Sequence, residues 1–319
     1  MNRHRSGSSQ LGFFVALVSG ISFSTLGIFA EMLYAEGFSV ASALAWRFVV
    51  ASLFLWAVVY VRMYFRKRFH LRAQDIQGTT EDHVAVRKRF FRVFLLGLIG
   101  FSPQAGLFFL TVKILDPGIT SLFLYLYPSF VFLIGFLLKH QKPGRVQSFA
   151  LLLSLVGCIL TFWKAGSYPT VGLVLGVVVA IAYAVYLVAG ESVLQNVDSL
   201  WATAVIMTAA ALVYLCISIG GGTFIVPVSL KQILLVVCIA LFATVVPIVT
   251  LFMAMQRIGA RDTSIISTVE PVFTNILSMI FFGELMTGRR ILGGSLILAG
   301  VIILNRWGYP SRRKAEVAS

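Results

Sequence analysis

The chain has 319 residues, of which 59% are hydrophobic and only 12% are charged, and its mean hydropathy is +0.93. A soluble globular protein carries about 25% charged residues, so a water-soluble fold could not cover its surface with so few polar side chains. The formal net charge of +14 sits in short clusters between long apolar runs, which argues against nucleic-acid binding and indicates a membrane protein.

Ten apolar runs, each about as long as a helix that crosses a bilayer, follow one another along the chain. The first five cover residues 11–30, 38–61, 93–112, 117–138 and 146–163. The second five cover residues 171–190, 199–219, 233–256, 263–283 and 291–305. We therefore predict an all-α integral membrane protein of about ten transmembrane helices, in which the first run is a retained span and not a signal peptide.

The basic residues predict how these spans are oriented. With ten spans, twenty of the 26 Lys and Arg residues fall on the side that holds both termini, and five fall on the other side. The positive-inside rule then makes both termini cytoplasmic, in a plasma or bacterial inner membrane. The largest cluster is a basic loop at residues 62–92, which we interpret as an orientation signal that contacts lipid headgroups. A basic cytoplasmic tail follows at residues 308–319.

The chain also contains two related halves, at residues 11–163 and 170–307. A shift of 143 residues places Pro128 on Pro271, together with several residues around each. Because each half has an odd number of spans, the second half must enter the membrane from the opposite side. Such inverted repeats are typical of alternating-access transporters, although channels can be built in the same way.

Four prolines lie inside predicted spans, in helices that are equivalent between the halves. They are Pro103, Pro128, Pro247 and Pro271. Proline kinks a helix and frees a backbone carbonyl, which a membrane tolerates where a neighbour or a cavity satisfies the freed group. We expect these kinks to line a central pathway, and ordinary kinks that only aid packing are the alternative.

Three short segments carry a family resemblance. Residues 269–273 read VEPVF, residues 282–287 read FGELMT and residues 293–300 read GGSLILAG, while Trp46, Arg47 and Phe48 lie in the second span. These motifs closely resemble the EamA repeat of the drug/metabolite transporter superfamily, and the resemblance covers essentially the whole chain as two EamA-like units. It implies a ten-helix fold with both ends in the cytoplasm, and export of amino acids or other small metabolites.

Two charged residues lie deep in the predicted spans. Arg47 is about 13 Å of helix from the start of its span, and Glu270 is the only acid in the middle of one. Such charges must face protein or water, and each should have a partner. We consider Arg47 as a clamp for a substrate carboxylate and Glu270 as a site for a proton or an ammonium group. The alternative is a structural ion pair between them, or contacts of Arg47 with helix ends.

The ninth predicted span has one polar face, which carries Ser264, Thr268 and Asn275, with Glu270 at its edge. The equivalent face of the fourth span is aromatic and includes Tyr125. We expect these faces to bind an amphipathic solute, since polar faces of membrane helices avoid lipid. Hydrogen bonds between helices, without a ligand, are the alternative.

The function expected from these features is secondary transport of a small metabolite, such as an amino acid or a similar amphipathic solute, by alternating access and in the direction of export. The expected partners are the lipid bilayer and a small-molecule substrate, with no nucleic acid, metal or cofactor. A channel or facilitator is the first alternative. A membrane-embedded enzyme is less favoured, because the sequence has no intramembrane histidine, nucleophile elbow or metal-ligand cluster. Whether the chain forms a homodimer is left open.

Overall fold

The computed structural model describes residues 2–68, 83–115, 117–139, 144–162, 167–283 and 287–307, and these residues form helices and no strand. In the first half the segments are α1 (Asn2–Phe23), α2 (Leu26–Ala35), α3 (Val40–Arg68), α4 (His83–Leu95), the π-helical η1 (Leu96–Phe101), α5 (Ser102–Ile114), α6 (Pro117–Leu124), α7 (Tyr127–Lys139) and α8 (Arg145–Phe162). In the second half they are α9 (Thr170–Val193), α10 (Ser199–Gly220), α11 (Leu230–Ala240), the π-helical η2 (Leu241–Val245), α12 (Val246–Ser267), α13 (Glu270–Phe282) and α14 (Gly288–Trp307).

Eight helices in the described part of the chain are long and apolar enough to cross a membrane. Two further apolar helices, Arg145–Thr161 and Glu270–Phe281, are shorter. The longest candidate, Leu230–Ser267, has 38 residues, well beyond the roughly 20 that one crossing needs. The lengths and composition are those of a multi-pass membrane protein, while the number of ten spans stays a prediction.

The predicted basic loop at residues 62–92 is shorter than expected. Helix α3 continues to Arg68 and α4 begins at His83, so both ends of the predicted loop are helical. Arginine and lysine favour helices, and their long side chains let a helix continue from the membrane into water. The remaining part of this loop, residues 69–82, and the tail at residues 308–319 lie outside the described residues.

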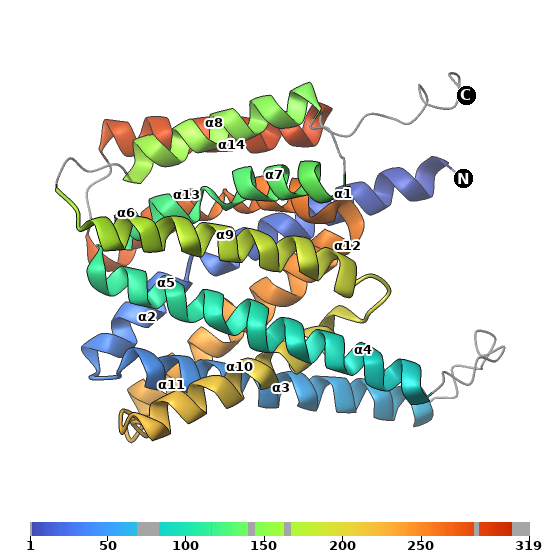
Figure 1. The fold of residues 1–319 in the computed structure, drawn as a ribbon, viewed down its shortest axis with the longest axis vertical. Coiled ribbons are helices and arrows are strands. Elements are labelled where there is room, and N and C mark those ends of the chain that lie inside the picture. Colours follow the sequence, from blue (N-terminus) through green and yellow to red (C-terminus); the bar gives the residue numbers. More distant parts are fainter. Residues whose placement is uncertain are drawn as a thin grey trace.

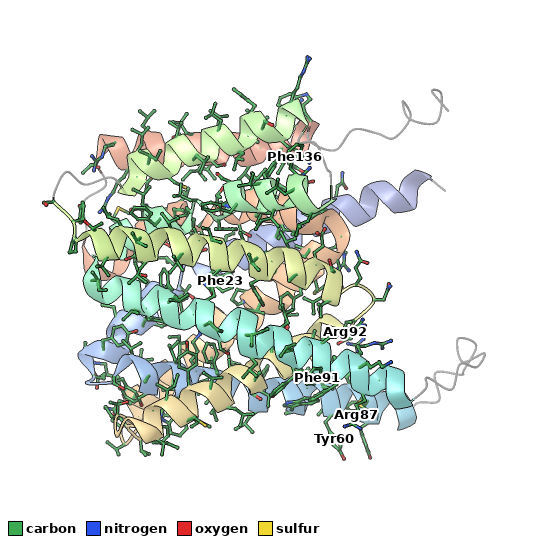
Figure 2. All side chains as sticks on the ribbon, in the orientation of Figure 1. Phe23, Tyr60, Arg87, Phe91, Arg92 and Phe136 are labelled. Carbon is green, nitrogen blue, oxygen red and sulfur yellow. The ribbon has the colours of Figure 1, made fainter. Side chains whose placement is uncertain are left out.

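The helices run roughly side by side, with α8 and α14 along one edge of the bundle and α3, α10 and α11 along the other (Figure 1). Helix α1 begins and α14 ends at the same end of the bundle (Figure 1). Figure 2 shows Arg87, Phe91 and Arg92 on α4 and Tyr60 on α3 near this end. We call it the basic end, because it also holds Arg257 and Arg306. At the opposite end, Lys231 forms an ion pair with Glu36.

Each of the four intramembrane prolines is the second residue of a helical segment, and each follows an irregular stretch of backbone. Pro103 and Pro247 come directly after η1 and η2, where the helix widens into π-helical turns. Pro128 and Pro271 come after breaks, between α6 and α7 and between α12 and α13. A proline has no N–H and its ring clashes with the carbonyl four residues earlier, so the preceding turn must widen or break. The same two irregularities therefore recur in both halves.

Candidate functional site

A cavity of about 90 Å³ lies where three helix breaks meet. Its walls come from the α1/α2 break, from α5, from the α6/α7 break and from the start of α13. The residues that line it are Phe23, Ser24, Leu26, Gly27, Ala30, Phe108, Phe109, Ser121, Tyr125, Glu270 and Thr274. Figure 2 shows Phe23 in the middle of the bundle.

The α1/α2 break is held by hydroxyl groups instead of a proline. Ser24 donates a hydrogen bond to the Ile21 carbonyl, and Thr25 donates one to the Ser22 carbonyl, so both side chains satisfy backbone groups at the break. One turn earlier, Gly20 lets α1 approach the α12/α13 break closely. A Cβ atom on Gly20 would lie only 2.7 Å from Cγ1 of Val269. These contacts bring the first break to the cavity.

Glu270 is the first residue of α13, and its carboxyl group forms a side-chain hydrogen bond with Tyr125. The N-terminus of a helix favours a negative charge, because the unpaired N–H groups and the helix dipole point toward it. Tyr127, Tyr183 and Cys158 also lie close enough to interact electrostatically with Glu270. The rings of Tyr127 and Tyr183 are 4.7 Å apart at an angle of 61°. Glu270 thus faces mainly aromatic side chains.

A second, larger cavity of about 520 Å³ lies between α3, α5 and α10, towards the opposite end of the bundle. It is lined by Ser39, Val40, Ala41, Leu44, Leu98, Ser102, Pro103, Gly106, Phe109, Leu110, Val213, Tyr214, Ile217 and Thr223. Phe109 lines both cavities and is only 7% exposed. Tyr34 packs against it edge to face, with 6.5 Å between the ring centroids. The ring of Phe109 therefore lies between the two spaces.

Towards the basic end, the bundle is closed by a set of contacts that we call the basic-end seal, made by Gln147, Glu191, Gln256, Arg261 and Asp262. Gln147 donates from Nε2 to Oδ1 of Asp262 over 2.7 Å, which joins α8 to α12. The Arg261 guanidinium lies 4.8 Å from the ring centroid of Phe132 on α7. Gln256 donates to the carbonyls of Leu194 and Val197, in the connection between α9 and α10.

Gly259 gives this seal its backbone shape. Its φ and ψ angles are 82° and 165°, which interrupt the helical conformation of the residues on both sides. The next residue, Ala260, donates its backbone N–H to Oε1 of Glu191 over 3.3 Å. A Cβ atom at position 259 would lie 2.9 Å from that same oxygen. Only glycine adopts this conformation readily.

Arg47 has other partners than Glu270. Its Nε donates to Oγ1 of Thr244 over 2.6 Å, and its Nη2 donates to the Ala243 carbonyl over 3.3 Å. Arg47 is 3% exposed and lines neither cavity, and no ion pair joins it to Glu270 within the described residues. Both partners of Arg47 belong to η2, one a side-chain hydroxyl and the other a backbone carbonyl, and a role of Arg47 in binding a substrate stays a prediction.

The other predicted site residues fall into two groups. Ser264, Thr268 and Asn275 donate to carbonyls of their own segment, and none of them lines either cavity. Tyr125 and Glu270 share the smaller cavity. Pro103 lines the larger cavity, while Pro128, Pro247 and Pro271 line neither.

Sequence reasoning missed Phe23, Ser24 and Phe109. The hydroxyl residues Ser19, Ser22, Ser24 and Thr25, clustered inside a long hydrophobic run, were a readable signal for the first break. Nothing in the sequence distinguishes Phe109 from its neighbour Phe108.

Comparisons with known proteins agree on one family. The sequence profile of the EamA-like transporter family matches twice, at residues 10–163 and 170–306. The chain is 24% identical over 306 residues to the uncharacterized transporter YyaM of Bacillus subtilis, which covers 92% of this chain and 93% of the relative. It is also 24% identical over 211 residues to the uncharacterized transporter YdfC of the same organism, covering 66% of this chain and 69% of the relative. A solved crystal structure matches with a TM-score of 0.73 and 19% identity, over 93% of this chain and 96% of the other.

Proposed function

The chain belongs to the EamA-like transporter family, and from this premise we propose that it exports a small amphipathic metabolite by alternating access at the cavity that holds Glu270. The observation that carries this proposal is the position of that cavity. It lies at the three helix breaks, holds the carboxyl group of Glu270, and shares the Phe109 ring with the larger cavity. A carrier needs a barrier on each side of its site, because the two sides must open in turn, and we assign these roles to the basic-end seal and to the Phe109 ring.

The arrangement of the two halves supports an inverted repeat. Helix α1 and helix α9, which begin the two halves, run in opposite directions across the bundle (Figure 1). Both halves also repeat a π-helical segment and a break, each followed by proline. Two similar units that face opposite ways provide two related conformations, in which one unit opens towards each side of the membrane.

The distribution of basic residues supports an assignment of which end of the bundle faces the cytoplasm. With the basic end in the cytoplasm of a cell membrane, as the positive-inside rule requires, the seal closes the cytoplasmic side. The larger cavity then lies on the outer side, so the conformation described here is closed inward. Export would begin when the seal opens and the cavity takes up a metabolite from the cytoplasm.

The test is counterflow in liposomes that contain the purified protein. Vesicles preloaded with unlabelled metabolites, each tried in turn, should take up the matching labelled compound in a saturable way. Glu270→Gln should abolish this uptake. Glu31→Gln is the matched control, because Glu31 is an exposed acid on α2 that lines neither cavity. Single-channel currents without counterflow would establish a channel and refute the carrier, and equal uptake by both variants would remove Glu270 from the mechanism.

A further inference from the structure

The charge of the two cavities points to the kind of head group that binds there. Among the residues that line either cavity, Glu270 is the one charged side chain. Arg47, which is buried, lines neither cavity and donates to Thr244 and Ala243. An anionic ligand in the smaller cavity would therefore meet a carboxyl group with no compensating positive charge. A cationic ligand would supply the positive charge that the residues lining the cavity do not offer to Glu270.

The walls of the smaller cavity suit an organic cation. The rings of Phe23, Phe108, Phe109 and Tyr125 line the same space as the Glu270 carboxyl group. An ammonium group over an aromatic ring gains about 0.5–2 kcal/mol, and sites that bind alkylated ammonium groups are commonly built as aromatic cages. A small inorganic cation would instead require several oxygen ligands in close geometry.

The sizes of the two cavities suggest which one holds the polar head group of a ligand and which one holds its apolar part. The smaller cavity, of about 90 Å³, has less than a fifth of the volume of the larger one, of about 520 Å³, so we assign the head group to the smaller space. The larger cavity beyond Phe109 has room for an apolar body, and its lining is mostly aliphatic and aromatic. An amphipathic ligand would use both spaces once the Phe109 ring moves aside, which is the opening on that side that the transport proposal requires.

The internal repeat places a single acidic residue at the two equivalent helix breaks. At the shift of 143 residues, Tyr127 stands where the second half has Glu270, so the two equivalent breaks together carry one acid. On the helices packed against α13, the charged residues are Glu31 on α2, Arg3 and Arg5 in the first turn of α1, and three arginines on α14. Glu31 is exposed, and the arginines of α14 lie in its first and last turns, at residues 289, 290 and 306. One carboxyl group can balance one proton or one ammonium group, not both.

We infer that the substrates are amphipathic amines, whose ammonium head binds Glu270 within the aromatic cavity and displaces a proton from it. This inference rests on the proposed transport function. In the exchange, the N–H donors of the ammonium group bind the Glu270 carboxylate, and the proton that leaves the carboxyl oxygen passes to water. One monovalent amine is thereby exchanged for one proton.

The test uses three probes with the same phenyl ring on a two-carbon linker. Phenethylamine is a cation at neutral pH, phenylalanine is a zwitterion and 3-phenylpropionate is an anion. Their binding to the purified full chain in detergent is measured by calorimetry, and proton release is followed with a pH indicator in weak buffer. We expect phenethylamine to bind at least tenfold more tightly than the other two, and to release up to one proton for each amine bound.

Two substitutions locate the effect. Glu270→Gln should weaken phenethylamine binding at least tenfold and remove the proton release, whereas Glu31→Gln should change neither. If Glu270→Gln does not fold, Glu270→Asp keeps the charge and should retain weaker binding. Equal or tighter binding of phenylalanine or 3-phenylpropionate to the unmodified chain overturns the inference, as does amine binding that survives Glu270→Gln. Glu270-dependent counterflow of a metabolite, together with a failure to bind phenethylamine, would leave the transport proposal standing and refute only the amine.

Discussion

Gly259 allows the basic-end seal to be perturbed with a single methyl group. In Gly259→Ala, the backbone conformation at φ 82° and ψ 165° costs about 1–3 kcal/mol for a residue other than glycine. The new Cβ atom would also lie 2.9 Å from Oε1 of Glu191, the oxygen that accepts from Ala260. We take about 2 kcal/mol as the loss of stability of the sealed conformation relative to the conformation open at the basic end. Since 1.4 kcal/mol is a factor of ten, the population open at the basic end should rise about 30-fold.

A natural cysteine can report this change. Cys158 is 2% exposed, interacts with Glu270, and lies about three turns further along α8 than Gln147 of the seal. Replacing Cys216 and Cys238 by alanine leaves it as the one thiol of the chain. With N-ethylmaleimide, the labelling rate of Cys158 in Gly259→Ala should rise by up to about 30-fold over the parent.

The matched control is Gly37→Ala at the opposite end. Gly37 also has a positive φ, 87°, but a Cβ atom there would meet nothing within 4 Å. This variant carries similar backbone strain away from the seal, so its Cys158 labelling should equal that of the parent. Equal labelling rates in Gly259→Ala and the parent would refute the reasoning that the seal depends on this glycine.

Two further substitutions test how the bundle is held together, with thermal unfolding in detergent as the measurement. Thr244→Val removes the acceptor of Arg47 Nε and should lower the free energy of unfolding by about 1.5–3 kcal/mol. The control Thr250→Val should have a much smaller effect, because the Thr250 hydroxyl donates to carbonyls of its own helix. Equal effects of the two variants would mean that the Arg47 contact is unimportant. Gly157→Leu should lower stability by about 1–3 kcal/mol or more, because its Cβ atom would lie 2.5 Å from the carbonyl oxygen of Gly293, and an unchanged unfolding temperature would contradict this packing.

The helical fold could be predicted because the bilayer fixes the length of a crossing helix and excludes unpaired backbone groups. The four prolines also correctly marked places where the helix departs from α geometry. Their sequence context did not indicate which departure would follow. Pro103 and Pro247 follow π-helical turns and Pro128 follows a break, although each proline removes the same N–H group.

The candidate site was harder to predict, because a helical period gives the face of a polar residue but not the partner of its side chain. Ser264 lies in α12, Thr268 at the break and Asn275 in α13, and each donates to a carbonyl of its own segment. Arg47 finds its acceptor on Thr244, which is 197 residues further along the chain. Contacts of that range come from tertiary packing, and a single sequence does not encode them in any local pattern.

The contact between α8 and α14 constrains how the two halves can move. Gly157 and Gly293 bring these helices so close that a Cβ on either would lie within 2.6 Å of a carbonyl oxygen of the other helix, and a Cβ on Gly300 would lie 2.7 Å from the Ala150 carbonyl oxygen. Two main chains in direct contact have no side-chain rotamers between them that could absorb sliding. We therefore expect α8 and α14, the last helices of the two halves, to move together as one rigid body, so that any motion between the halves must occur in the remaining helices.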